Sequence, residues 1–548
     1  MKTLISKKKF SLTQLALAVA ASLSTSQAFA DTVTDWNIYT TLATKGATSL
    51  TTGNKSIALN SNVATRIDAI EARAVFDAVN AVDHFSPKGY YYNGSAALSG
   101  LTPNSAAAAA AQAAHDVLLG TLPSTPAWTG TRNWLDNQLT NDLVALGVSA
   151  SDPGIVVGQA AAIAALAARV GDNSAIRTTY TPSTNLSINT SVTPNTIVPN
   201  ATGNPGVGLW RPSNGAAGVI DPITGAATGF NSADEIQAAA AIDFNWKNVT
   251  PFSLTTQAKQ ELVAAVPPSL KIGSDEYLQE LEFVKTHGQD SAHPGNRTDD
   301  QLLQALYYKS DAELFTNEVA RIASAARNLT LDQNAKLFAA LDNAVADARI
   351  AAWQSKYDLV FWRPITAINA DASGAATTYD WKPLGTTPSH PSSTGGHSST
   401  VSAGTEIPRA FFHSDSIVPG NTPVTLSGLP WLVGTNNGTG QLQSPINGQD
   451  ATTRDVSTFS RLQLENGRSR LYLGVHYGND DFQGQSLGLA VADKIIKEHK
   501  DPAVAGVSIY HGNREVASAK NLYSIFVKKS ADSGFYGLDA LDEEHKED

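Results

Sequence analysis

The segment WQSKYDLVFWRP, residues 353–364, is the first of three segments that decide how this chain is expected to fold. HPSSTGGH follows at 390–397 and SRLYLGVHYGND at 469–480. Together they supply lysine, arginine, histidine and a Gly-Gly pair, the groups that surround a small oxyanion in proteins. The cationic and imidazole side chains are Lys356, Arg363, His390, His397, Arg470 and His476. The three segments therefore predict one binding site for phosphate or a phosphate-shaped metal oxyanion.

The chain around these segments has the apolar periodicity of helices. A long helix is predicted from Leu331 to about Tyr357, which places Lys356 at its end. Arg363 precedes a proline and is expected to begin a loop. Further helices are predicted at 64–84, 106–119, 133–146, 155–170, 255–266, 275–287, 299–326, 398–412 and 469–498. No alternating strand pattern is evident, so the prediction is an all-α fold with its chemistry at helix ends.

Composition suggests an exported, acidic protein with a large core. Residues 1–30 have a basic start, a short apolar run and Ala28-Phe29-Ala30, which is typical of a signal peptide cleaved after Ala30. The formal net charge is −11, which argues against nucleic-acid binding, and no long apolar run predicts a membrane span. The absence of cysteine excludes disulfides and thiolate chemistry. We expect a periplasmic or secreted protein, while the sequence leaves its oligomeric state open.

The mature chain is predicted to have two helical parts and a tail. Residues 31–330 form the N-terminal part, interrupted by a long Thr-, Asn-, Pro- and Gly-rich surface loop at 171–235. Residues 331–500 form the C-terminal part, which carries the oxyanion site. Residues 501–548 are a polar tail that is expected to be partly ordered at best.

The third segment is chemically the most specific of the three. His476 and Asp480 are four positions apart, which on a helix lets the carboxylate hold one tautomer of the imidazole. Such a carboxylate raises the basicity of a histidine that bonds a metal or attacks phosphorus. In the second segment, Gly395, Gly396 and His397 open a predicted helix, whose backbone N–H groups can point at an anion.

Taken together, the segments resemble the signature of the vanadium-dependent haloperoxidase and type 2 phosphatidic acid phosphatase superfamily. That signature reads K-x6-R-P, P-S-G-H and S-R-x5-H-x3-D. The segments EARAVFDAVNAVD, GVGLWRPS, FNWKNVTPF and ADARIAAWQSKYDLVFWRPITAI are similar to its soluble bacterial chloroperoxidase-like branch over nearly the whole mature chain. The resemblance implies two packed four-helix bundles with long surface loops, as in vanadium chloroperoxidase and related acid phosphatases.

The resemblance also implies a role for each site residue. Lys356, Arg363, Gly396 and Arg470 would bind the equatorial oxygens of vanadate, a site that phosphate can also occupy. His476, held by Asp480, would bond the vanadium, and His397 would be the general acid and base. Trp353 and His390 would line a halide pocket, with His390 favouring bromide or iodide. Asp311 is the candidate for orienting His397.

One position departs from the signature. Gly395 stands where the signature has a serine whose hydroxyl would donate to the oxyanion. Two explanations are open: a donor is missing from the site, or the backbone at Gly395 requires a positive φ that serine would resist.

Three functions remain open for such a site. The first is a haloperoxidase that uses vanadate, a Lewis acid that needs no redox change, to oxidise halide with hydrogen peroxide to hypohalite. The second is an exported acid phosphatase in which His476 attacks a phosphate ester and forms a phosphohistidine. The third is a non-catalytic relative that only binds an oxyanion. Activation by vanadate would distinguish the first from the second, which vanadate should inhibit.

Overall fold

A computed structural model describes residues 31–46, 59–94, 98–176, 207–210, 243–370, 379–385, 387–426, 453–498 and 500–512. The expected signal peptide, most of the 171–235 loop and the tail beyond residue 512 lie outside these described residues.

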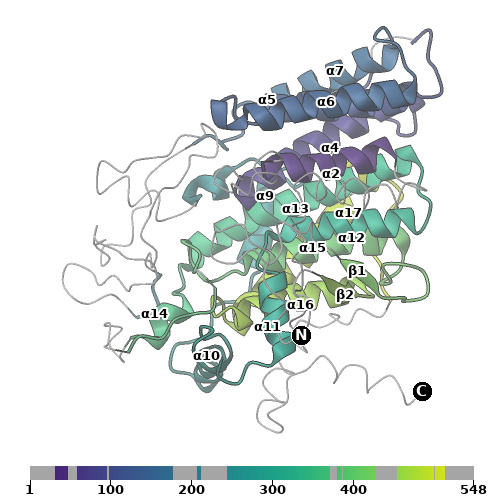
Figure 1. The fold of residues 1–548 in the computed structure, drawn as a ribbon. Coiled ribbons are helices and arrows are strands. Elements are labelled where there is room, and N and C mark those ends of the chain that lie inside the picture. Colours follow the sequence, from purple (N-terminus) through teal and green to yellow (C-terminus); the bar gives the residue numbers. More distant parts are fainter. Residues whose placement is uncertain are drawn as a thin grey trace, which may run out of the picture.

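Helices dominate the described residues (Figure 1). They are α2 (Thr32–Thr44), α4 (Ser61–Asp83), α5 (Ser105–Thr121), α6 (Thr129–Leu146), α7 (Pro153–Ala168), α9 (Thr256–Ala264), α10 (Asp275–His287), α11 (Asp299–Tyr307), α12 (Ala312–Ala325), α13 (Leu331–Leu359), α14 (Pro364–Ile368), α15 (Gly396–Phe412), α16 (Phe459–Tyr472) and α17 (Gly478–Glu498). Short 3-10 helices are η2 (Pro126–Trp128), η3 (Phe244–Asn248) and η4 (Pro502–Val504). Two strands, β1 (Val424–Leu426) and β2 (Arg454–Val456), pair antiparallel. The mostly helical fold expected from the sequence is confirmed.

Several local predictions were wrong. The helix predicted at 299–326 is two helices, α11 and α12, separated by a turn that ends at Asp311. The helix predicted at 469–498 is also two, because the chain breaks between Tyr472 and Gly478. Arg363 does not begin a loop but is the N-cap of α14, where Pro364 takes the first helical position. The helix α2 and the two short strands were not predicted.

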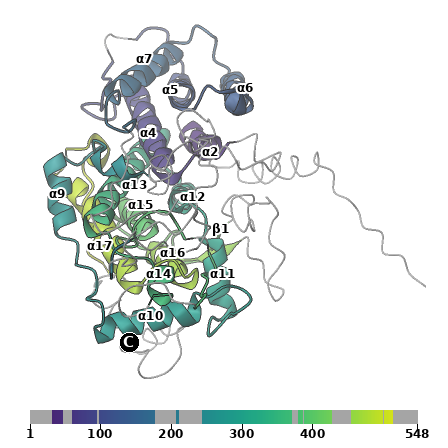
Figure 2. The ribbon, with the colours of Figure 1, turned by 90° about the vertical axis from the view of Figure 1, so that its left-hand side faces the viewer.

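The helices pack in layers around α13. α5, α6 and α7 form an outer layer above α4 and α2, and α15, α16 and α17 lie on the other side of α13 (Figures 1 and 2). α13 contacts α4 on one side and α15 on the other. Its side chains therefore form part of the core for the helices on both sides of it. One apolar core, including Ile67, Leu341 and Val491, runs continuously from α4 through α13 to α17.

Glycines bring the backbones of α15 and α17 unusually close. A Cβ added at Gly484 would lie 2.4 Å from the carbonyl oxygen of Gly395, and one at Gly488 would lie 2.3 Å from that of Ser399. Any larger residue would force the two helices apart. This contact fixes the N-terminus of α15 beside the start of α17, where the second and third sequence segments meet.

The start of the predicted tail packs against the body of the protein. Asp501 is buried and accepts hydrogen bonds from Ser253 and from the side-chain amide of Asn343, the latter at 2.9 Å. The tail is thus ordered at least through η4. Among the described helices, none combines the length and the hydropathy that a membrane crossing would require.

Candidate active site

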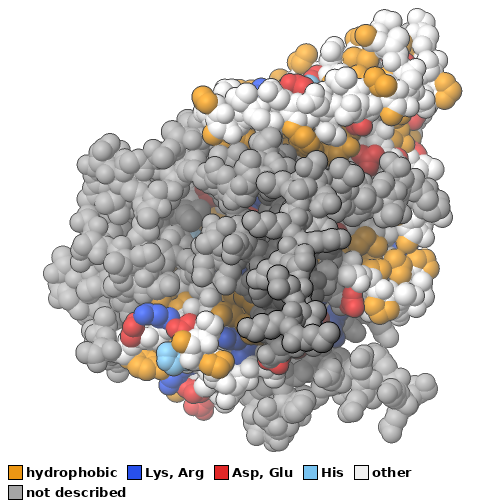
Figure 3. All heavy atoms as spheres, in the orientation of Figure 1, with side chains coloured by type: hydrophobic (Ala, Val, Ile, Leu, Met, Phe, Trp, Pro, Cys, Tyr) orange, Lys and Arg blue, Asp and Glu red, His pale blue; other side chains and the backbone are white. Residues whose placement is uncertain are grey.

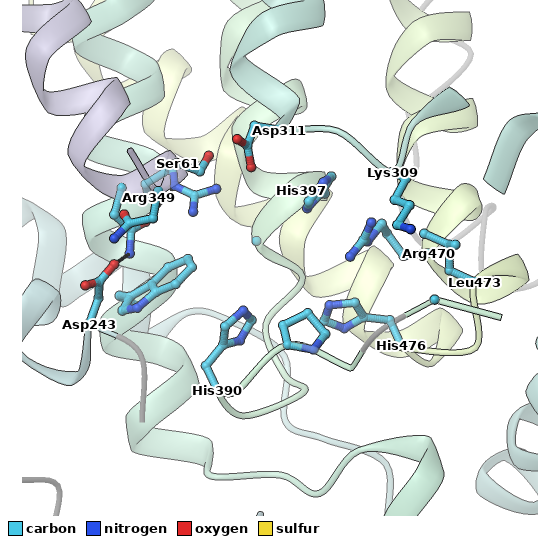
Figure 4. A pocket seen from close by; sticks show the side chains of 16 residues that line it. Ser61, Asp243, Lys309, Asp311, Arg349, His390, His397, Arg470, Leu473 and His476 are labelled. Carbon is cyan, nitrogen blue, oxygen red and sulfur yellow. Dashed lines mark hydrogen bonds between the residues drawn. The ribbon is translucent and has the colours of Figure 1, made fainter. Parts of the chain in front are cut away.

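All three sequence segments meet at a cavity of about 270 Å³ (Figure 4). Its wall contains residues from α4, α13, α15 and α16 and from the turns before α12 and α17. They are Asn60, Ser61, Asn62, Asp243, Lys309, Asp311, Arg349, Trp353, Gly385, Pro388, His390, Gly396, His397, Arg470, Leu473 and His476. Away from the cavity, hydrophobic side chains are exposed on the outer layer of α5, α6 and α7, at the top of the space-filling view (Figure 3).

Asp480 holds His476 in one orientation. The Nδ1 atom of His476 lies 2.9 Å from Oδ2 of Asp480. Both residues were predicted to lie on one helix, but His476 precedes α17, which begins at Gly478. The hydroxyls of Ser392 and Ser393 also donate to the Asp480 carboxylate, at 2.5 and 2.6 Å. This network connects the second and third segments, and it leaves Nε2 as the imidazole nitrogen that faces Arg363, 3.0 Å from Nη1.

Arg363 and Lys356 are fully buried immediately behind the cavity wall. Arg363 donates to the backbone carbonyls of His390 at 3.0 Å and Val475 at 2.6 Å. Lys356 donates to the carbonyls of Pro391 at 2.9 Å and Ser392 at 3.0 Å. Neither makes an ion pair with a described carboxylate within 4.0 Å. Burial first, and then the Arg363 cation, hold the pKa of Lys356 well below its usual range, and a bound anion would favour its charged form.

Lys356, Arg363, Gly396 and Arg470, the residues expected to bind the oxyanion, are called the oxyanion cage below. Of its three cations, Arg470, near the end of α16, is the one that lines the cavity directly. Its side chain is buried, and its Nε and Nη1 atoms have no hydrogen-bond partner among the described residues. Burial lowers its pKa to about 10, and burial together with Arg470 lowers the pKa of Arg363 to about 9. Two buried, unsatisfied N–H groups on one wall are a strong reason to expect an anion there.

Burial also determines the charge of the three cavity histidines. Burial first, and then the Arg363 and Lys356 cations, hold the pKa of His476 well below its usual range. The pKa values of His390 and His397 are likewise lowered, chiefly by burial and then by Lys356 and Arg470 respectively. The imidazoles are therefore neutral near pH 7. With Nδ1 protonated toward Asp480, a neutral His476 has its lone pair on Nε2, as a metal ligand or nucleophile requires.

Gly396 begins α15, as the sequence predicted, and Gly395 is its N-cap. The φ of Gly395 is −61°, so the explanation that this glycine needs a positive φ was wrong. A Cβ at Gly395 would instead lie 2.7 Å from the carbonyl oxygen of Asp480, which accepts the Gly395 N–H at 2.8 Å. Glycine is therefore required for close backbone approach, and a serine does not fit here without displacing α17.

The orienting role expected of Asp311 requires correction. Nε2 of His397 lies 3.0 Å from the backbone carbonyl oxygen of Ser310. The Asp311 carboxylate lines the same cavity but pairs with Lys45, at 2.5 Å. The turn between α11 and α12 thus positions His397 through a main-chain carbonyl, a contact that no side-chain pattern could predict.

Trp353 and His390 lie together as the sequence suggested. Their ring centroids are 5.0 Å apart, and both line the cavity. Sequence reasoning missed Arg349, Asp243 and Lys309, which also line it. Arg349 could have been found, because it lies one turn before Trp353 on the same face of α13.

Comparisons with known proteins agree with this architecture. Residues 336–503 match the family model of the second helical-bundle domain of vanadium chloroperoxidase. Over 265 residues the chain is 25% identical to vanadium chloroperoxidase from Curvularia inaequalis. That match includes 40% of this chain and 44% of the Curvularia protein, so less than half of the relative's length is spanned.

Solved structures extend the similarity across most of the chain. A bacterial vanadium-dependent iodoperoxidase aligns with a TM-score of 0.55 and 20% identity, over 83% of this chain and 95% of its own. An apo-type bacterial vanadium-dependent chloroperoxidase aligns with a TM-score of 0.56 and 18% identity, over 81% and 95%. Residues 336–503 therefore match the second helical-bundle domain of vanadium chloroperoxidase, and the overall fold is that of bacterial vanadium-dependent haloperoxidases.

Proposed function

We propose that this protein is a vanadate-dependent haloperoxidase, which oxidises halide with hydrogen peroxide to hypohalite and water. One observation carries the proposal. The unsatisfied N–H groups of Arg470 and the neutral imidazole of His476 face one cavity, with two further buried cations behind it. That combination suits an oxyanion whose central atom accepts a nitrogen lone pair.

The residues present fit vanadate. Arg470 would donate through Nε and Nη1, and the N–H of Gly396, in the first turn of α15, is available at the same wall. A Cβ at Gly396 would meet the Trp353 ring at 3.3 Å, so the glycine lets that ring pack close to the start of α15. Lys356 and Arg363 would add charge from behind, and Nε2 of His476 would be the ligand to vanadium.

When bound, vanadate would supply a Lewis acid that activates peroxide without changing its own oxidation state. The surrounding cations would stabilise negative charge that develops on oxygen in a water-poor site. His397 faces the cavity with its Nε2 hydrogen-bonded to the Ser310 carbonyl, so Nδ1 is left as the nitrogen that can take up and release a proton. Asp480 would keep His476 in the tautomer that presents Nε2.

Two finer parts of the proposal concern the halide and the location. His390 lies beside Trp353, and the family resemblance associates a histidine at this position with bromide or iodide rather than chloride. The signal-like segment at residues 1–30 supports export to the periplasm or the medium.

The proposal is tested by titrating vanadate into metal-free protein and following bromide- and iodide-dependent halogenation of a dye in the presence of peroxide. The expected result is a saturable rise in rate above protein-free vanadate, with iodide and bromide used better than chloride. Aryl-phosphate hydrolysis that vanadate inhibits would instead identify an acid phosphatase at the same site. Saturable vanadate binding without turnover would identify a non-catalytic relative.

A further inference from the structure

Arg349 is a buried cavity arginine that the oxyanion cage does not use. It is only 4% exposed, and its guanidinium lies over the Trp353 ring, 4.7 Å from the centroid. Nε donates to the side-chain oxygen of Asn62 at 2.7 Å, and Nη1 donates to the Thr400 hydroxyl at 3.2 Å. Both partners are neutral. No described carboxylate lies within 4.0 Å of this guanidinium, so its charge has no direct ion-pair partner there.

The second amino group of Arg349, Nη2, makes no hydrogen bond to a described residue. Figure 4 shows Arg349 and Arg470 on opposite sides of the cavity, with His397 between them. Thr400 fixes the Arg349 side: its hydroxyl accepts from Arg349 and donates to the carbonyl of Gly396 at 2.8 Å. Arg349 is therefore held in a set position relative to the cage, with donors to spare.

The charges on this wall limit what can bind. Asp311 and Glu313 both pair with Lys45, at 2.5 and 3.2 Å, and so lose much of their effect on the cavity. Asp243 lines the cavity and accepts from the Asn62 amide at 2.9 Å. These carboxylates would repel a dianion bound at Arg349, whereas one negative charge is matched by the guanidinium itself. Lys309, on the Arg470 side, adds further positive charge.

We propose that Arg349, with the Trp353 ring beneath it, forms a second anion subsite that binds a monoanion beside the oxyanion cage. The monoanion is either the halide or the carboxylate of an organic acceptor. The role of this subsite in turnover rests on the proposed function, whereas the binding of an anion at Arg349 does not. It makes Arg349 a residue that selects the second substrate, separate from the groups that hold vanadate.

Arg73 offers a matched control. It is also buried, donates from Nε to an asparagine oxygen (Asn343) at 2.7 Å, and lies over an aromatic ring (Tyr90) at 4.3 Å. Its remaining nitrogens are used by Tyr91 and Ser253, and it does not line the cavity. Arg73→Met therefore reports what the loss of a buried guanidinium costs the fold, without any change in the cavity.

The first experiment compares steady-state kinetics of Arg349→Met, Arg73→Met and the wild type, each loaded with vanadate. We expect Arg349→Met to raise the KM for iodide about tenfold or more, the effect of losing one charged hydrogen bond, with little change in kcat or in vanadate Kd. A rise in the KM of a carboxylate-bearing acceptor instead assigns the subsite to the acceptor. Unchanged KM values for both overturn the proposal.

The second experiment needs no turnover. Iodide and benzoate are titrated into phosphate-filled protein, and saturable quenching of tryptophan fluorescence or a rise in Tm reports binding. The saturable signal should disappear in Arg349→Met, persist in Arg73→Met and be weakened in Arg349→Lys, which keeps the charge but loses the planar donor pair. If Arg349→Met does not fold, Arg349→Lys decides. Loss of turnover with this signal intact contradicts the haloperoxidase proposal alone, and equal binding by all variants contradicts the subsite.

Discussion

Replacing His476 with alanine is expected to abolish vanadate-dependent halide oxidation. It should also weaken vanadate binding by more than about 100-fold, because loss of even an outer partner of a metal ligand costs about 10–100-fold. The physical reason is that Nε2 of His476 is a neutral nitrogen beside the buried Arg363, and Asp480 fixes its orientation through Nδ1. Activity and equilibrium dialysis with vanadate, run side by side, measure both effects.

A histidine outside the cavity provides the control. His293 is exposed and bonds only to Asp290 among its described partners, so His293→Ala should retain wild-type activity and affinity. Tight vanadate binding by His476→Ala would contradict the assignment of His476 as the ligand. Normal turnover by that variant would remove His476 from the catalytic machinery altogether.

Restoring the family's serine at position 395 is expected to damage the protein. The added Cβ would lie 2.7 Å from the Asp480 carbonyl oxygen and 3.0 Å from the Ser398 hydroxyl oxygen. Because the first contact is with backbone, relief requires α17 to move, at a cost of about 1–3 kcal/mol in folding free energy. That movement carries Asp480 and therefore His476, so vanadate affinity should also fall, by about tenfold. Thermal unfolding and vanadate binding measure the two losses.

Gly395→Ala separates the clash from the hydroxyl. It introduces the same Cβ without a donor, so both variants should lose stability and affinity to a similar extent. If Gly395→Ser binds vanadate more tightly than the wild type while Gly395→Ala does not, a missing hydroxyl donor explains the departure from the signature, and the close-approach explanation is wrong.

Much of the fold follows from the sequence because helical periodicity is a local property. The long helix α13 and the helix that begins at Gly396 were predicted to within a few residues. The break between α11 and α12 was missed for a physical reason. Asp311 leaves helical geometry where it pairs with Lys45, a residue 266 positions earlier, and a contact of that range leaves no signal in local periodicity.

The candidate site was predicted in part. Spacing identified His476 and Asp480 as partners, and the structure places their side chains within hydrogen-bond distance. The sequence pattern could not show that the backbone carbonyl of Ser310 contacts His397, because every residue type has the same main-chain carbonyl. Arg349 was not singled out either, although its position one turn before Trp353 on the same face of α13 was a usable signal.

The most direct measurement is a crystal structure of the protein soaked with vanadate. We predict that the vanadium atom is bonded to Nε2 of His476, with its oxygens accepting hydrogen bonds from Nε and Nη1 of Arg470 and from the N–H of Gly396. An anion held elsewhere in the cavity, or one that contacts the arginines without a bond to His476, would contradict the proposed site and the vanadate-dependent function built on it.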